Sequence, residues 1–293
     1  MQPLINAGFE LVFPTPGAAP DGAQLIAAVP SCIGWLAGVE KVTPAVIAAA
    51  DALRVISRNG TGVDNLPMSV IETRGIAVAR AEGANAQGVA ELALTLALAG
   101  LRDVVPTNVG MKHGDWPRRI GREMAGARVG VVGLGAIGAL FAQFCLALGA
   151  QVQGFDPFAP ANRIANHAFV RTELPGALEG ADVVSLHAPM PTDGQPLIGA
   201  DLLALLAPGA VLVNTARAGL VAPQALIAAL NAGRLGTYAT DVFETEPPEP
   251  SPLLSHPRVI LTSHIGGFTT ASVERATSMA VANLLNILHA HAD

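Results

Sequence analysis

The sequence has few cysteines, no long run of basic residues and no apolar leader at its start. Only Cys32 and Cys145 occur among its 293 residues. This argues against a disulfide framework and favours a reducing compartment. Asp and Glu outnumber Lys and Arg by 23 to 17, and no basic cluster marks nucleic acid or an anionic membrane surface as a partner. Residues 1–6 lack the features of a secretory signal, so the expected location is the cytoplasm.

Charged residues are also missing from residues 129–150, a stretch long enough to cross a bilayer. We do not predict a membrane span there. Gly130, Gly133, Gly135 and Gly138 interrupt its β-branched residues in the manner of a strand, a turn and a helix.

From residue 128 onward, short runs rich in Val and Ile alternate with stretches rich in Ala and Leu. This alternation is typical of βαβ units that build a parallel sheet. Six such strands make a complete Rossmann cofactor domain. The predicted strands are Arg128–Val132, Gln151–Phe155, Asp182–His187, Ala210–Asn214, Gly236–Val242 and Arg258–Thr262.

The first 80 residues repeat this alternation on a smaller scale, and they predict a second doubly wound α/β domain. A helix over residues 85–102 leads into the six-stranded region, and a last helix over residues 270–289 is expected to pack back on the first domain. The boundaries are residues 1–87 plus 270–293 and residues 88–269, with a hinged ligand cleft between the domains. The predicted strands of the small domain are Phe9–Phe13, Cys32–Leu36, Arg54–Arg58 and Ile76–Arg80.

A glycine-rich motif follows the first strand of the larger domain and opens the next helix. In this motif Gly133 permits a tight turn, Gly135 lets the backbone approach a pyrophosphate, and Gly138 allows close packing of helix and strand. The candidate cofactor-binding residues of the motif are Gly133, Gly135, Ala136, Ile137 and Gly138.

Asp156 ends the next strand at the spacing where an acidic residue reaches the adenosine ribose. A carboxylate there accepts hydrogen bonds from the ribose hydroxyls and repels a 2′-phosphate, which favours NAD over NADP. Arg163 could reach this region, although an exposed loop arginine is the simpler interpretation.

Three further polar residues follow successive predicted strands, at the edge where parallel sheets hold ligands. His264 can exchange a proton with a substrate hydroxyl, and Glu246 can fix its tautomer and favour the imidazolium. Arg217 can hold a carboxylate with its fork of N–H groups. The three residue types suit hydride chemistry on a 2-hydroxy acid.

With these motifs, the sequence resembles the D-isomer-specific 2-hydroxyacid dehydrogenases, especially the phosphoglycerate dehydrogenase-like branch. The resemblance spans nearly the whole chain. It is carried by the segments Gly60–Asn65, Gly130–Gly138, Ser185–Pro189, Asn214–Arg217, Asp241–Pro247 and His264–Gly267. It implies a six-stranded Rossmann cofactor domain and a smaller flavodoxin-like substrate domain.

The resemblance also assigns roles to residues. It implies Arg217, Glu246 and His264 as the catalytic set, with Arg217 binding substrate together with the loop of Asn59, Gly60 and Thr61. Arg58 and Arg80, which end two strands, either meet a substrate phosphate or pair with nearby acids. The further residues implied at the cofactor are His187, Thr215, Ala216, Asp241 and Gly266.

The expected activity is NAD-dependent hydride transfer between nicotinamide and C2 of a small D-2-hydroxy or 2-keto acid, either 3-phosphoglycerate or glyoxylate and hydroxypyruvate. An NAD(H)-binding scaffold with little turnover is the alternative, and a formate- or phosphite-oxidising relative is a third. No histidine pair has metal-ligand spacing, so no metal is predicted. Residues 102–122 resemble the arm through which family members dimerise, and a homodimer is expected.

The ends of the sequence depart from the family pattern. Members normally begin with a strand before the helix that is expected here around Pro3, so we expect a late start or an unusual sheet edge. The expected last helix comes close to the end of the chain, so regulation by serine through a further domain is not expected.

Overall fold

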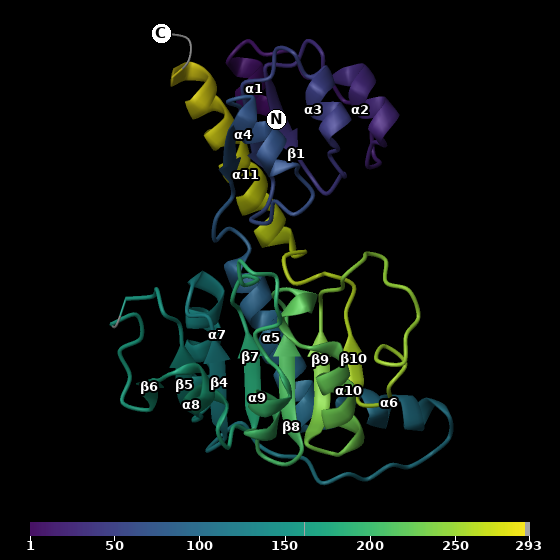
Figure 1. Ribbon diagram of the computed structural model, residues 1–293, viewed down its shortest axis with the longest axis vertical. Helices are drawn as coiled ribbons and strands as arrows, with labels where there is room; N and C mark the ends of the chain where they lie inside the picture. The colour runs from purple at the N-terminus through teal and green to yellow at the C-terminus, as the bar shows by residue number, and fades with distance from the viewer. Residues whose placement is uncertain (161, 291–293) are drawn as a thin grey trace. The chain divides into compact units, whose positions relative to one another are not determined.

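The computed structural model describes residues 1–160 and 162–290 of the chain and divides it into two compact units. Unit 1 comprises Met1–Asn85 and Thr270–Asp293, and unit 2 comprises Ala86–Thr269. Both units are parallel α/β structures (Figure 1). The helices that the structure describes include none with the length and apolar character needed to cross a membrane.

Unit 1 is built on a three-stranded parallel sheet in the order β1-β2-β3. One face is covered by α11, whose backbone at Ala280 accepts a 2.7 Å hydrogen bond from the buried hydroxyl of Ser57 on β2. The strands are β1 (Gly34–Ala37), β2 (Val55–Arg58) and β3 (Ala77–Arg80); the helices are α1 (Gln2–Asn6), α2 (Gly22–Ala28), α3 (Pro44–Ala49), α4 (Met68–Thr73) and α11 (Thr270–Ala290).

The strand predicted at Phe9–Phe13 is wrong, because these residues form irregular chain. Phe9 and Leu11 instead pack into a cluster with Leu284 and Leu288 of α11. The apolar alternation in this segment therefore reflects packing against a helix and not a place in the sheet.

Unit 2 contains a seven-stranded parallel sheet in the order β10-β9-β8-β7-β4-β5-β6. Strand order reverses between β4 and β7, which is the point where sheets of this kind bind ligands beyond their carboxyl ends. The strands are β4 (Arg128–Val132), β5 (Gln151–Phe155), β6 (Phe169–Arg171), β7 (Val183–Leu186), β8 (Ala210–Asn214), β9 (Leu235–Thr240) and β10 (Val259–Leu261).

The sheet therefore has one strand more than the six that were predicted. The additional strand, β6, lies at the edge beside β5 and has only three residues, with Val170 57% exposed. So short and exposed a strand has too little apolar periodicity to be recognised in a sequence.

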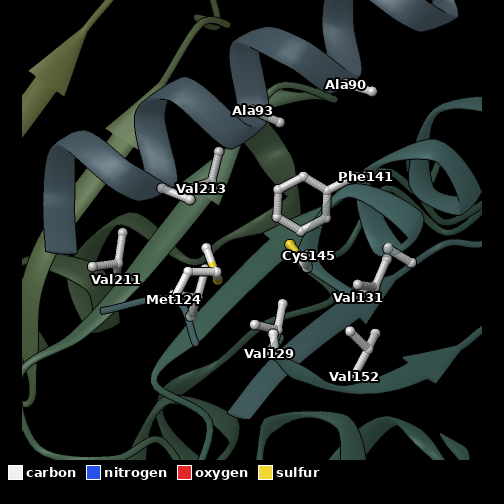
Figure 2. Close-up of a cluster of buried hydrophobic side chains, with 14 of the residues drawn as sticks. Ala90, Ala93, Met124, Val129, Val131, Phe141, Cys145, Val152, Val211 and Val213 are labelled. Carbon is white, nitrogen blue, oxygen red and sulfur yellow. The ribbon is translucent and has the colours of Figure 1, made fainter. Parts of the chain in front are cut away.

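Helices cover both faces of the larger sheet. In Figure 2, Phe141 and Cys145 of α7 lie against Val129 and Val131 of β4, with Ala93 of α5 in the same cluster. Burial raises the pKa of the Cys145 thiol to about 12, so this residue fills core space as a neutral thiol. The helices of unit 2 are α5 (Ala86–Leu101), α6 (Val104–Lys112), α7 (Ala136–Ala147), α8 (Leu174–Leu178), α9 (Ala200–Ala204) and α10 (Pro223–Asn231), with a 3₁₀ turn at Ala218–Leu220.

Candidate active site

The glycine-rich loop joins β4 to α7, and two of its three glycines have a steric reason within the described chain. Gly133 has φ of +92°, and a Cβ there would lie 2.6 Å from the backbone of His187. A Cβ on Gly138 would lie 1.9 Å from the carbonyl oxygen of Gly133. Gly135 has open space where its Cβ would stand. The first and third glycines therefore close the turn, and the second leaves room for a ligand at the start of α7.

Asp156 follows β5 and connects that strand end to the glycine-rich loop. Its Oδ2 accepts a 2.7 Å hydrogen bond from Leu134 N, and its Oδ1 accepts hydrogen bonds of 2.8 and 2.9 Å from Phe158 N and Ala159 N. Partial burial acts to raise the pKa of Asp156, but these backbone hydrogen bonds and the charge of Arg171 outweigh that effect and lower the pKa. The carboxylate is therefore ionised at neutral pH and placed beside the loop that would cradle a pyrophosphate.

His187 follows β7, and its backbone is in close contact with the glycine-rich loop at Gly133. Its Nε2 lies 2.9 Å from Ser185 Oγ, and its ring centroid lies 5.3 Å from that of Phe141. Nδ1 is buried without a hydrogen-bond partner among the described residues. Desolvation lowers the pKa of His187 to about 3, so the imidazole is neutral at physiological pH.

This neutral histidine is expected to make the fold sensitive to acid. The unfolded chain takes up a proton near the ordinary pKa of 6.5, whereas the folded pKa is about 3, so stability is lost as pH falls from 6.5 toward 3. From pH 7 to pH 5 we expect a loss of about 2 kcal/mol in the free energy of unfolding.

Urea denaturation followed by circular dichroism at both pH values would measure this loss. His187→Asn, which cannot take up the proton, is expected to lose about 2 kcal/mol less over the same interval. An equal loss in both proteins would show that another group controls the acid sensitivity.

The turn after β8 carries Arg217, and a buried asparagine holds it. Asn214 Nδ2 donates a 2.8 Å hydrogen bond to Arg217 O, and Asn214 Oδ1 accepts a 3.1 Å hydrogen bond from Ala216 N. The guanidinium itself donates from Nη1 to Ala216 O at 2.7 Å. Thr215 Oγ1 is buried without a partner among the described residues. The two Asn214 hydrogen bonds hold the base of the turn, and the Thr215 hydroxyl is the polar group that they leave unsatisfied among the described residues of the turn.

Glu246 and His264 are in direct contact. His264 Nδ1 lies 2.8 Å from both carboxylate oxygens of Glu246. Because Nδ1 is engaged by the carboxylate, Nε2 is the nitrogen that can exchange a proton with a substrate. His264 also has φ of +56°, a left-handed conformation that is uncommon outside glycine and that recurs at functional sites.

Asp241, which follows the end of β9, fixes the segment that bears His264. The residue is only 2% exposed, and its carboxylate accepts three hydrogen bonds, from Thr262 Oγ1 at 2.6 Å, Ile265 N at 2.9 Å and Gly266 N at 2.8 Å. These bonds bracket His264 on both sides. The structure therefore shows Asp241 anchoring the histidine turn, while its contact with nicotinamide stays a prediction.

The substrate-loop candidates belong to unit 1. Arg58 ends β2, and its Nη1 donates to Ala37 O at 3.2 Å and to Asn59 O at 3.4 Å. Burial lowers the pKa of this guanidinium, while the charges of Glu40 and Asp64 act to raise it. Thr61 Oγ1 donates to Ala81 O at 3.4 Å, and Gly60 has φ of +151°.

Within unit 2, most of the predicted site residues share one edge of the sheet. Gly133, Asp156, His187, Arg217 and Asp241 each follow the carboxyl end of a different strand, and His264 follows β10. Among these residues, Glu246 and His264 are in direct side-chain contact. Two supporting residues were not predicted from the sequence. Asn214, which holds the Arg217 turn, lies inside the segment Asn214–Arg217 that resembles the family, and Arg171 lies on β6, a strand that was not predicted.

The residues of this edge fit a dinucleotide. The open space at Gly135 allows a phosphate to approach the start of α7, and the ionised carboxylate of Asp156 can accept hydrogen bonds from a ribose. The Thr215 hydroxyl, which has no partner among the described residues, offers a further polar group to the ligand. The fold and this edge define unit 2 as a dinucleotide-binding domain with an adjoining histidine–carboxylate pair.

Comparisons with known proteins agree that unit 2 is a dinucleotide-binding domain. Residues 94–266 match the family model described as the NAD binding domain of D-isomer specific 2-hydroxyacid dehydrogenase. The chain therefore belongs to the D-isomer specific 2-hydroxyacid dehydrogenase family, and its cofactor is NAD.

Several relatives are similar over most of this chain. D-3-phosphoglycerate dehydrogenase of Mycobacterium tuberculosis is 37% identical over 260 residues, which are 88% of this chain and 49% of that protein. The (S)-sulfolactate dehydrogenase of Chromohalobacter salexigens is 38% identical over 85% of this chain and 82% of that protein. The crystal structure of the TT0316 protein of Thermus thermophilus has a TM-score of 0.87 and 32% identity, over 99% of this chain and 93% of that one. This chain spans about half the length of the phosphoglycerate dehydrogenases it matches.

Proposed function

We propose that the protein is an NAD-dependent oxidoreductase that transfers hydride between nicotinamide and C2 of a small D-2-hydroxy or 2-keto acid. The contact of 2.8 Å between His264 Nδ1 and Glu246, in a family whose members carry an NAD-binding domain, is the observation that carries this proposal. We place this activity in the cytoplasm, in line with Cys32 and Cys145 being free thiols.

The proposed chemistry divides the two hydrogens of the alcohol between cofactor and protein. NAD, when bound, supplies a nicotinamide ring that accepts the hydride from C2. His264 Nε2 takes the hydroxyl proton as the C2 carbonyl forms, and it returns that proton in the reverse direction. Glu246 holds the ring through Nδ1 and stabilises the imidazolium that results. Arg217 binds the substrate carboxylate through two parallel N–H groups.

The substrate class we favour carries a second anionic group besides its carboxylate. Arg58 and Arg80 are paired in register at the ends of β2 and β3, so two guanidinium groups start from one edge of the small sheet. The relatives named above include dehydrogenases of 3-phosphoglycerate and of sulfolactate, whose names specify a phosphate and a sulfonate. We propose that the loop of Asn59, Gly60 and Thr61 binds the same substrate.

A substrate panel tests the activity. NADH oxidation would be followed with 3-phosphohydroxypyruvate, hydroxypyruvate, glyoxylate and pyruvate, and we expect the highest kcat/KM with the phosphorylated acid. Higher values for glyoxylate and hydroxypyruvate would assign the smaller acids instead. Tight NADH binding without turnover of any member would favour an NAD(H)-binding scaffold.

We also propose that the protein forms a homodimer through the arm of residues 102–122. Helix α6 of this arm buries none of its residues against the described chain. Trp116 is 76% exposed, and Ile120 is fully exposed. Large apolar side chains grouped on one exposed segment are typical of an interface. A second copy of the chain carries the same segment, so the arms of two copies can pack against each other symmetrically.

Substitution in this arm is expected to convert the dimer to a monomer. The variant Trp116→Ser/Ile120→Asp removes apolar area and places a charge at the interface, so light scattering coupled to gel filtration should give about half the mass of the unmodified protein. Phe158→Ser, at a 93% exposed phenylalanine outside the arm, serves as the control and should leave the mass unchanged. A monomeric unmodified protein, or a dimer that survives the double substitution, would contradict the proposal.

A further inference from the structure

Arg171 ends β6, the edge strand that the sequence did not predict. The register pairs Arg171 with Gly154 of β5, two residues before Asp156. Its Nη1 donates a 2.5 Å hydrogen bond to Ala159 O, and its Nη2 donates to Asp156 O. The guanidinium is therefore held by main-chain carbonyl groups of the loop at residues 156–159, and this attachment does not depend on the carboxylate of Asp156.

The carboxylate of Asp156 is occupied in a different way. It accepts backbone hydrogen bonds from Leu134, Phe158 and Ala159. The loop at residues 156–159 thus contains an anion that is bound by N–H groups, and its carbonyl groups bind a cation that comes from β6. Since a guanidinium has five N–H groups and the two hydrogen bonds to the loop use two of them, Arg171 retains donors for a ligand.

These two groups have opposite effects on the adenosine end of a dinucleotide. A carboxylate accepts hydrogen bonds from the free 2′-hydroxyl of NAD and repels the 2′-phosphate of NADP, whereas an adjacent arginine accommodates that phosphate. We propose that Arg171 is a specificity-determining residue: a fixed cation for a 2′-phosphate whose effect is masked by Asp156. This inference rests on the proposed NAD-dependent function.

Replacing Asp156 should expose the effect of Arg171 on cofactor preference. Asp156→Ser removes the negative charge but keeps a hydroxyl that can accept one of the loop N–H groups. Because Arg171 is anchored to backbone, it stays in place in this variant. Asp156→Ser is therefore expected to bind NADPH more tightly than NADH, without the addition of a new basic residue.

Calorimetric titration with NADH and NADPH separates the role of Arg171 from that of the loop. We expect Arg171→Leu, made in the Asp156→Ser background, to weaken NADPH binding by about ten- to a hundred-fold, with a much smaller effect on NADH. Arg171→Lys, which keeps the cation, should retain part of the NADPH affinity. Arg163→Ser is the matched control, because Arg163 is an exposed cation near the same loop, and it should change neither affinity.

Three results would overturn the proposal. They are an absence of NADPH binding by Asp156→Ser, an equal NADPH affinity with and without Arg171, and an equal loss of NADH and NADPH affinity in Arg171→Leu, which would show that Arg171 only shapes the loop. Thermal unfolding of each variant verifies that it is folded. The proposed catalytic function is judged separately, by turnover of the unmodified protein on the substrate panel.

Discussion

Replacing His264 with asparagine is expected to lower kcat by about 10²- to 10⁴-fold, the usual contribution of a general acid–base residue. Asparagine tolerates the left-handed backbone that His264 adopts at φ of +56°, so the turn should be kept. Nε2 is lost, and with it the group that we propose exchanges the hydroxyl proton. Steady-state kinetics with the best acid of the panel and NADH would measure the change.

NADH binding and a Glu246 variant serve as the controls for His264→Asn. Calorimetry should give a dissociation constant for NADH close to that of the unmodified protein, because the glycine-rich loop and Asp156 are untouched. Glu246→Gln retains a hydrogen-bond acceptor for Nδ1 but loses the charge, so its kcat should fall less than that of His264→Asn. An unchanged kcat in His264→Asn would remove this histidine from the mechanism.

Substitution of Arg217 should affect the substrate and not the cofactor. Arg217→Ala removes the two charge-assisted hydrogen bonds that we propose for the substrate carboxylate, and kcat/KM for the keto acid is expected to fall by about 10²- to 10⁴-fold. The dissociation constant of NADH should stay close to its original value. The two measurements together distinguish a substrate ligand from a residue that supports the whole site.

Arg217→Lys is the matched variant for this test. Lysine keeps the positive charge but lacks the planar fork, so we expect an intermediate kcat/KM. If Arg217→Ala weakened NADH binding as much as substrate use, its role would instead be to maintain the turn, through the hydrogen bond that its Nη1 donates to Ala216 O.

The cofactor loop shows how much local sequence can predict. A strand, three glycines and a helix are consecutive in the chain. The structure shows a close backbone approach that requires glycine at Gly133 and at Gly138, and open space at Gly135. The predicted bounds of β4, β5 and β8 agree with the structure residue for residue. β4 and β8 are almost entirely buried and give unbroken apolar runs, while β5 alternates buried residues with more exposed ones.

Other features depended on contacts between residues far apart in the sequence. The strand predicted at Phe9–Phe13 is irregular chain, because apolar alternation does not distinguish a ladder from packing on α11. Asp241 accepts hydrogen bonds from both sides of His264, more than 20 residues away in sequence, a role that its place in a motif did not indicate.

By itself, the sequence determined the α/β class, the family, the place of the glycine-rich loop between β4 and α7, and the identity of the polar residues that follow each strand. These features follow from short-range patterns, because the ligand-binding residues of a βαβ unit follow the carboxyl ends of its strands in every protein that contains such a unit. Only the tertiary structure decided that Nδ1 of His264 faces Glu246 and that Arg171 lies beside Asp156. Both depend on which strand is adjacent to which and on the direction of a side chain, and a linear pattern of residue types does not encode either.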